Sequence, residues 1–371
     1  MNSTQIKQAA KQKKRILVLH TGGTFGAEPC SLETTKTLTM QHLPLSTQLH
    51  NRIPEIFEIA DLEIRVLFGQ DSSNLHCANW AALAREVETA WQEFDSFIII
   101  HGTDTLAYCA SFFSLVFANL TKPIVITGSQ RPLAELRSDA RMNMIDSVQL
   151  ATLGYAEVFV CFNSDVFLAS RVSKVSNLNL GAFHSPNFPK LGHFGVEILL
   201  NDALLPNTAC ATTLPPIDLR TDARVICLGV APGLQLPKKL RHAILDCSAG
   251  LIFEGFGLGH APTNECSWVD LAREAHAAEI PVIMTSQCRA GRVDMSLYEV
   301  GRELANQGVV SAHDMTPECA TIKLMMLLGR RVPFGDRAHF MNLPLAREVT
   351  PPNLTHHALT PPHQASAEED Q

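Results

Sequence analysis

The sequence predicts an α/β protein with a larger N-terminal domain, built on a doubly wound and mostly parallel sheet, and a smaller C-terminal α/β domain. The first observation is a set of short, uninterrupted apolar runs that stop at glycine, a pattern typical of strands buried on both faces of a parallel sheet. The second is that these runs alternate with segments of helical period, which predicts right-handed strand–helix–strand units. The third is the length of 371 residues, sufficient for two domains.

The N-terminal domain is expected to span residues 15–203. Its expected elements are strands near 16–19, 64–68, 97–100, 123–127 and 158–162, and helices near 80–94, 106–120 and 141–153. The segment 26–40 is rich in Thr, Ser, Glu and Gly without an apolar period. It is longer than an ordinary connection, and we expect a mobile lid there.

The remaining segments follow from shifts in composition. Proline-rich residues 204–222 predict a linker, residues 223–345 a second α/β domain, and residues 1–14 and 346–371 a disordered arm and tail. Within the second domain we expect strands near 225–228, 250–253 and 281–284, and helices near 265–278, 295–307 and 317–329.

Composition excludes several classes of function. A net charge of −7 argues against nucleic acid or an anionic membrane as the main partner, because both require a basic face. The first thirty residues lack the apolar stretch of a secretory signal, and no stretch is long and apolar enough to cross a membrane. The ten cysteines form no C-x-x-C pair, so we expect a reduced, cytoplasmic protein without structural disulfides or a zinc site.

Two apolar runs end in similar turns that present a threonine: Thr21-Gly22-Gly23-Thr24 and His101-Gly102-Thr103-Asp104. Ligands bind beyond the carboxyl ends of parallel strands, so both hydroxyls are expected in one pocket. The turns match neither G-x-G-x-x-G, the P-loop nor G-x-S-x-G. We interpret Thr24 as a nucleophile, with glycine amides free to bind substrate or an oxyanion. The alternative is tight structural turns, with Asp104 capping the following helix.

A hydroxyl nucleophile needs a proton acceptor, and Lys174 is the candidate because a buried lysine can become neutral and basic. Asp71 and Ser72 end another expected strand at the same edge. Their carboxylate and hydroxyl suit the ammonium and carboxylate of an amino acid, although an Asx or Ser turn explains them equally well.

Taken together and in order, these motifs resemble the bacterial-type L-asparaginases over about residues 14–330. Because it lacks a signal peptide, the chain resembles the cytoplasmic type I branch of this family rather than the exported type II branch. The matching segments are Thr21–Thr24, Asp71–Ser72, His101–Thr105, Thr127–Gln130, Leu136–Asp139, Lys174, Ser185–Asn187, Gly257–Gly259 and Asp314–Glu318.

The resemblance implies roles for the site residues. Thr24 corresponds to the nucleophile that forms a β-aspartyl ester and releases ammonia. Thr103, Asp104 and Lys174 correspond to a second triad that assists deacylation by water. Gly23, Asp71, Ser72, Thr103 and Asp104 correspond to substrate-binding residues. It further implies no metal or organic cofactor, and a homodimer or homotetramer with sites shared between subunits.

Two departures from the family pattern stand out. The family's loop tyrosine after Thr24 is missing, since the next tyrosine is Tyr108, and this predicts reduced activity. Tyr298 lies where some relatives contribute a tyrosine across the subunit interface. Glu254 stands where some type I members carry an arginine for allosteric asparagine, so no such allosteric site is expected.

The expected function is therefore hydrolysis of L-asparagine to L-aspartate and ammonia through a threonine ester. Three alternatives stay open. They are a catalytically weakened sensor of asparagine or aspartate, an amide-releasing subunit of the tRNA-amidotransferase type, and a hydrolase of D-asparagine, glutamine or a β-aspartyl compound.

Overall fold

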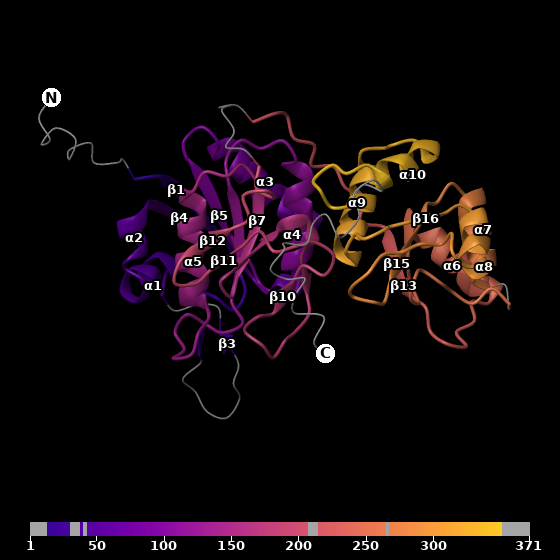
Figure 1. Cartoon of the computed structure of the whole chain (residues 1–371), viewed down its shortest axis with the longest axis horizontal. Helices are drawn as coiled ribbons and strands as arrows, with labels where there is room; N and C mark the ends of the chain where they lie inside the picture. Colours follow the sequence, from indigo (N-terminus) through magenta and orange to yellow (C-terminus); the bar gives the residue numbers. More distant parts are fainter. Residues whose placement is uncertain (1–12, 30–37, 40–42, 207–213, 265–266, 351–371) are drawn as a thin grey trace, which may run out of the picture.

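The chain forms two α/β domains that lie side by side along the long axis of the molecule (Figure 1). The structure is a computed structural model, and it describes residues 13–29, 38–39, 43–206, 214–264 and 267–350. The segment 204–222 separates the eight-stranded sheet of the larger domain from the four-stranded sheet of the smaller one. The predicted fold class is thus confirmed.

The larger sheet has the strand order β12-β11-β8-β7-β6-β5-β1-β4. The five strands from β4 to β7 are parallel, and β8, β11 and β12 extend the sheet antiparallel. Their bounds are β1 (Arg15–Gly22), β4 (Asp61–Gln70), β5 (Ser96–Ile100), β6 (Ile124–Thr127), β7 (Val158–Phe162), β8 (Asp165–Leu168), β11 (Gly192–Phe194) and β12 (Ile198–Leu200).

The strand order reverses between β1 and β5. From β1 the chain crosses to β4 on one side, and it then returns to β5 on the other side and continues outward through β6 and β7. The carboxyl ends of these two strands are therefore a topological switch point, the place in open α/β sheets where ligands bind. Both threonine turns predicted to carry chemistry lie at this point.

Helices cover both faces of the larger sheet and enclose two apolar cores. Side chains of β1, β5 and β6 alternate between the cores, which explains their uninterrupted apolar sequences. One face packs against α3 (Cys77–Ala90) and α4 (Leu106–Val116), and the other against α1 (Leu45–Arg52), α2 (Ile56–Ile59) and α5 (Ala140–Thr152). Two short strand pairs complete the domain, β2 (Glu28–Pro29) with β3 (Leu38–Thr39), and β9 (Ser173–Lys174) with β10 (Phe183–His184). Most of the predicted lid, 30–37 and 40, lies outside the described residues.

The smaller domain has a parallel sheet in the sequential order β13-β14-β15-β16, with helices on both faces. The strands are β13 (Val225–Gly229), β14 (Gly250–Gly255), β15 (Val282–Ser286) and β16 (Val309–Ser311), and the helices are α6 (Lys238–Cys247), α7 (Ser267–Ala277), α8 (Glu299–Asn306), α9 (Pro317–Gly329) and α10 (Phe334–Asn342). Helix α9 lies between the two domains (Figure 1), and three of its side chains, Cys319, Ile322 and Met326, join the core of the larger one.

The expected disordered tail is wrong for residues 346–350. Glu348 is fully buried and Val349 is 3% exposed. The carboxylate of Glu348 accepts from Lys323 Nζ at 2.5 Å, and Arg347 lies against the larger domain, where it pairs with Glu157. This segment packs across both domains, and no apolar period in the sequence indicated it. Residues 351–371 and 1–12 lie outside the described residues, whereas Lys13 and Lys14 are exposed and hydrogen-bonded or ion-paired.

No helix within the described parts of the chain is long and apolar enough to cross a membrane.

Candidate active site

The two threonine turns are packed directly against each other. A Cβ atom on Gly23 would lie 2.5 Å from the Cα atom of Gly102, and Gly23 has a positive φ of +81° that a side chain would strain. Glycine is therefore required at Gly23 so that the turn after β1 can touch the turn after β5. This contact brings the backbone beside Thr24 next to the backbone beside Thr103.

The loop after β4 joins the same cluster. A Cβ atom on Gly102 would lie 2.7 Å from Oγ of Ser72, so this serine contacts the second turn through the space that glycine leaves open. The hydroxyl of Thr105 donates to the carbonyl oxygen of Ser72 at 2.7 Å. The ends of β1, β4 and β5 thus converge, as the strand order predicts.

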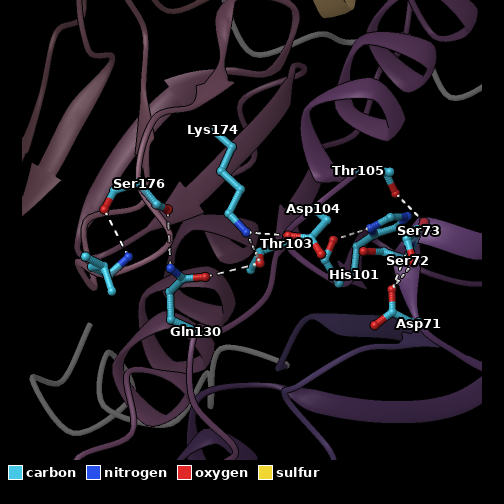
Figure 2. Close-up of polar contacts among 12 residues, drawn as sticks. Asp71, Ser72, Ser73, His101, Thr103, Asp104, Thr105, Gln130, Lys174 and Ser176 are labelled. Atoms are coloured by element: carbon cyan, nitrogen blue, oxygen red, sulfur yellow. Dashed lines mark hydrogen bonds and ion pairs between the residues drawn. The ribbon is translucent and has the colours of Figure 1, made fainter.

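Lys174 connects Thr103 and Asp104. It lies in β9, and its Nζ atom donates to Oγ1 of Thr103 at 2.8 Å and to Oδ1 of Asp104 at 2.6 Å (Figure 2). The lysine side chain is 18% exposed and the aspartate side chain 63% exposed. The carboxylate of Asp104 pairs with the lysine, and Thr105, at the start of α4, makes no side-chain capping bond, so the capping interpretation is not supported.

Gln130 lies on the other side of Thr103 (Figure 2). Its side-chain oxygen accepts from the hydroxyl of Thr103 at 3.2 Å, and its amide nitrogen donates to the carbonyl of Asn179 at 3.3 Å. The backbone nitrogen of Gln130 donates to the carboxylate of Asp139. Thr103 therefore has an oriented hydroxyl, with a lysine donor on one side and a fixed amide acceptor on the other.

Asp71 remains an anion at the edge of this cluster. Its Oδ1 atom accepts from the hydroxyl of Ser73 at 2.6 Å and from the backbone nitrogen of Ser73 at 2.8 Å. These hydrogen bonds lower the pKa of the Asp71 carboxyl, and Lys174 lowers it further. The Asx turn considered from sequence is present, and an ionised carboxylate there is also available to an ammonium group.

A cleft of about 780 Å³ begins at Asp104 and Lys174 and extends between the domains. Residues of the smaller domain form its opposite wall, among them Glu254, Arg289 and Glu318. The lysine therefore stands where the two domains meet.

Comparisons with known proteins agree with this geometry. The family model "Asparaginase, N-terminal" matches residues 15–205, and "Glutaminase/Asparaginase C-terminal domain" matches residues 224–341. The chain belongs to the asparaginase family.

Among its relatives, L-asparaginase 1 of Escherichia coli K12 is 34% identical over 92% of this chain and 99% of that protein. The solved structure of the thermostable L-asparaginase from Thermococcus kodakarensis superposes with a TM-score of 0.81 at 32% identity, covering 91% of this chain and 99% of that one. A glutamyl-tRNA(Gln) amidotransferase subunit from Methanobrevibacter smithii is 33% identical over 91% of this chain and 77% of its own length. The family thus includes more than one activity.

His101 is bonded to the backbone of the second threonine turn of this asparaginase-family site. The indole nitrogen of Trp80 donates to Nε2 of His101 at 3.2 Å, so Nδ1 carries the proton and donates to the carbonyl oxygen of Gly102 at 2.8 Å. Both His101 and His20 are buried, and burial lowers the pKa of each imidazole to about 4. His101 is thus packed and hydrogen-bonded through both ring nitrogens.

These two histidines predict an acid-sensitive fold. Their pKa is lower in the folded state than in the unfolded state, where it is 6.5, so the unfolded chain binds more protons at pH 4–6.5. Their contribution to stability is complete above pH 6.5 and is lost as the pH falls toward 4, by about 3 kcal/mol for each histidine. Urea midpoints measured from pH 7.5 to 4 should fall less steeply in His101→Asn than in the wild type. Parallel curves would contradict the assignment.

The structure brings most of the predicted site residues into one cluster, and it leaves Tyr298 outside that cluster. The structure brings Thr103, Asp104 and Lys174 into hydrogen-bond contact, and it packs Gly23 and Ser72 against Gly102. Thr24 follows directly after Gly23, and its carbonyl oxygen accepts from the backbone of Ala27.

Tyr298 lies elsewhere. It is the N-cap residue of α8, it is 58% exposed, and its ring packs against His260. Helix α8 itself lies at the end of the smaller domain away from the larger one (Figure 1). Its intersubunit role stays a prediction.

Sequence reasoning missed the role of Gln130 and the contacts that the smaller domain makes near Lys174. Gln130 had a detectable signal, because it ends the turn after β6, the next strand along the same edge of the sheet. No local sequence pattern indicated that Arg289 and Glu318 contact β9, since these contacts join residues more than a hundred positions apart.

Proposed function

We propose that this chain hydrolyses L-asparagine to L-aspartate and ammonia through a covalent ester on Thr24. The observation that carries the proposal is the position of Lys174 Nζ, which contacts both Thr103 and Asp104 at the carboxyl ends of the strands, beside the turn that bears Thr24. Family membership and the two L-asparaginase relatives support the same reaction class.

In the proposed reaction, the Thr24 hydroxyl attacks the side-chain amide carbon of asparagine. The C–N bond breaks, the hydroxyl proton is transferred toward the leaving nitrogen, and ammonia departs from a β-aspartyl ester. The amides around Gly23 are available to stabilise the oxyanion. A water molecule then attacks the ester carbon and restores the Thr24 hydroxyl as aspartate leaves.

The second triad acts on that water. Oγ1 of Thr103 and Nζ of Lys174 are 2.8 Å apart, so a neutral Lys174 would accept the hydroxyl proton of Thr103 while Oγ1 takes a proton from the water. The carboxylate of Asp104 at 2.6 Å stabilises the lysine when it is protonated. Gln130 accepts from the Thr103 hydroxyl and so fixes the position of Oγ1, and the hydroxyl must turn toward Lys174 for the relay.

Substrate recognition is assigned to the residues around the second turn. Asp71, kept ionised by Ser73, is proposed to bind the α-ammonium group, together with Asp104. Ser72 is proposed to bind the α-carboxylate. We propose further that the protein is a cytoplasmic asparaginase of type I and that it forms a homodimer or homotetramer. The proposed reaction needs no metal or organic cofactor.

One alternative keeps a specific observation in its favour. The amidotransferase relative from Methanobrevibacter smithii is about as similar as the L-asparaginases, at 33% identity. An amide-releasing role would use the same threonine ester but would deliver the ammonia to a partner. A sensor without turnover is favoured only by the missing loop tyrosine.

Ammonia release from L-asparagine and from L-glutamine, with Thr24→Ala alongside, tests the proposal. We expect release selective for asparagine in the wild type. The variant should lose it by at least about 10⁴-fold, because removing a nucleophile that acts as a unit with its base eliminates the covalent route. Near-normal turnover by Thr24→Ala would overturn the nucleophile assignment, and binding of asparagine without turnover by the wild type would support the sensor.

Thr152→Ala is the control for this experiment. Thr152 ends α5, and its hydroxyl donates to the carbonyl oxygen of Gln149 in the same helix. The variant therefore removes a threonine hydroxyl that contacts neither threonine turn, and it should release ammonia at the rate of the wild type.

A further inference from the structure

The strand that carries Lys174 pairs with β10 in the larger domain and is also bonded to the C-terminal part of the chain. Its neighbour Ser173 is 2% exposed, and the Ser173 hydroxyl donates to Oε1 of Glu318 in the first turn of α9 at 2.5 Å. This is the length of a hydrogen bond strengthened by a charged acceptor. Arg289 adds a second contact, with its guanidinium donating to the carbonyl oxygen of Lys174 at 3.2 Å.

The segment just before β9 is anchored in the same way. Arg171 is 1% exposed, and its guanidinium donates to Asp314 at 2.8 Å and to the carbonyl of Arg347 at 2.5 Å. Ser170 donates to the carbonyl of Ala346 at 2.8 Å. From Ser170 to Lys174, these bonds all lead to the smaller domain or to the segment 346–350.

Because of the geometry of a strand, the bonds that hold Ser173 also determine the direction of the Lys174 side chain. Successive side chains of an extended strand point to opposite faces, so Ser173 faces α9 while Lys174 faces Thr103. Rotation of β9 about its axis would move both side chains together. A bond that fixes Ser173 therefore fixes the direction from which Nζ of Lys174 approaches Oγ1 of Thr103.

We infer that Ser173 and Glu318 are positioning residues, through which the smaller domain sets the geometry of the proton relay at Lys174. The expected change in kcat rests on the proposed function, whereas the expected change in the position of Lys174 does not. Among the described residues, the hydrogen bond of Glu318 that leads toward Lys174 is the one to Ser173 in β9.

The kinetic test compares Ser173→Ala with Ser170→Ala. Each variant removes one buried serine hydroxyl that bridges to the C-terminal part of the chain, and the two positions are three residues apart. We expect similar losses of thermal stability. We expect kcat for asparagine to fall about 10- to 100-fold only in Ser173→Ala, because a displaced reacting group costs rate even when it is present. The Kd for aspartate should stay unchanged, since Asp71 and Ser72 are untouched.

Variants at Glu318 separate the hydrogen bond from the charge. Glu318→Gln keeps an acceptor for Ser173 and should retain most of kcat, whereas Glu318→Leu should match Ser173→Ala. The double variant Ser173→Ala/Glu318→Leu should be no slower than either single variant, because each substitution removes the same hydrogen bond. Equal kcat in Ser173→Ala and Ser170→Ala, or additive losses in the double variant, would overturn the inference.

A second readout needs no turnover. Labelling with an amine-specific acylating reagent, followed by peptide mapping, reports how freely Lys174 moves relative to the surface residue Lys190. We expect several-fold faster labelling of Lys174 in Ser173→Ala and an unchanged rate in Ser170→Ala. Unchanged labelling in both would overturn the positioning role. Absence of ammonia release by the wild type would instead overturn the proposed function, and the labelling comparison would still decide the inference.

Discussion

Replacing Lys174 with methionine is expected to lower kcat for asparagine hydrolysis by about 10²- to 10⁴-fold, the range that a positioned acid or base contributes. Methionine has a similar length but cannot donate to Thr103 or exchange a proton with it. Asp104 would also lose its cationic partner at 2.6 Å. Single-turnover kinetics and mass spectrometry of the intact protein are the measurements. We expect the aspartyl adduct on Thr24 to persist longer than in the wild type.

Lys190→Met is the matched control for this experiment. Lys190 also pairs with an aspartate, Asp165 in β8, at 2.6 Å, but it is 51% exposed and lies in the loop before β11. Its loss should leave kcat close to that of the wild type. If Lys174→Met also keeps a normal rate, Lys174 is not the proton relay.

Replacing Lys323 with methionine is expected to destabilise the protein by about 3–5 kcal/mol, the cost of leaving one member of a buried ion pair without its partner. Lys323 is 1% exposed and Glu348 is fully buried. The ammonium donates to the carboxylate of Glu348 at 2.5 Å and to the carbonyls of Met341 and Leu343 at 2.8 and 2.7 Å. Methionine would leave all three acceptors without this donor.

Thermal and urea unfolding of three variants test this expectation. Lys323→Met/Glu348→Leu should recover part of the loss, because it removes the uncompensated carboxylate together with the lysine. Lys190→Met, which breaks an exposed pair, should change stability by less than about 1 kcal/mol. A small effect of Lys323→Met alone would mean that the segment 346–350 contributes little to the folded state.

The sequence predicted the sheet strands well where local signals were strong. β5, β6 and β7 are continuous apolar runs because both of their faces are buried, and that requirement appears in every residue of the strand. β8, β11 and β12 were missed because they are short and lie in the antiparallel extension at one side of the sheet, where β11 and β12 are partly exposed. The disordered tail was assigned too early because the polar composition after residue 345 conceals a buried ion pair.

The sequence by itself determined the fold class and the residue types of the candidate site, because apolar period, glycine turns and the order of the motifs are local properties of the chain. Tertiary structure alone decided which of these residues meet. Lys174 reaches Thr103 across 71 positions, and Ser173 reaches Glu318 across 145. Such contacts depend on strand order and on the docking of the two domains. Neither leaves a periodic trace in the sequence, because a side chain that serves a distant partner is constrained by that partner and not by its neighbours.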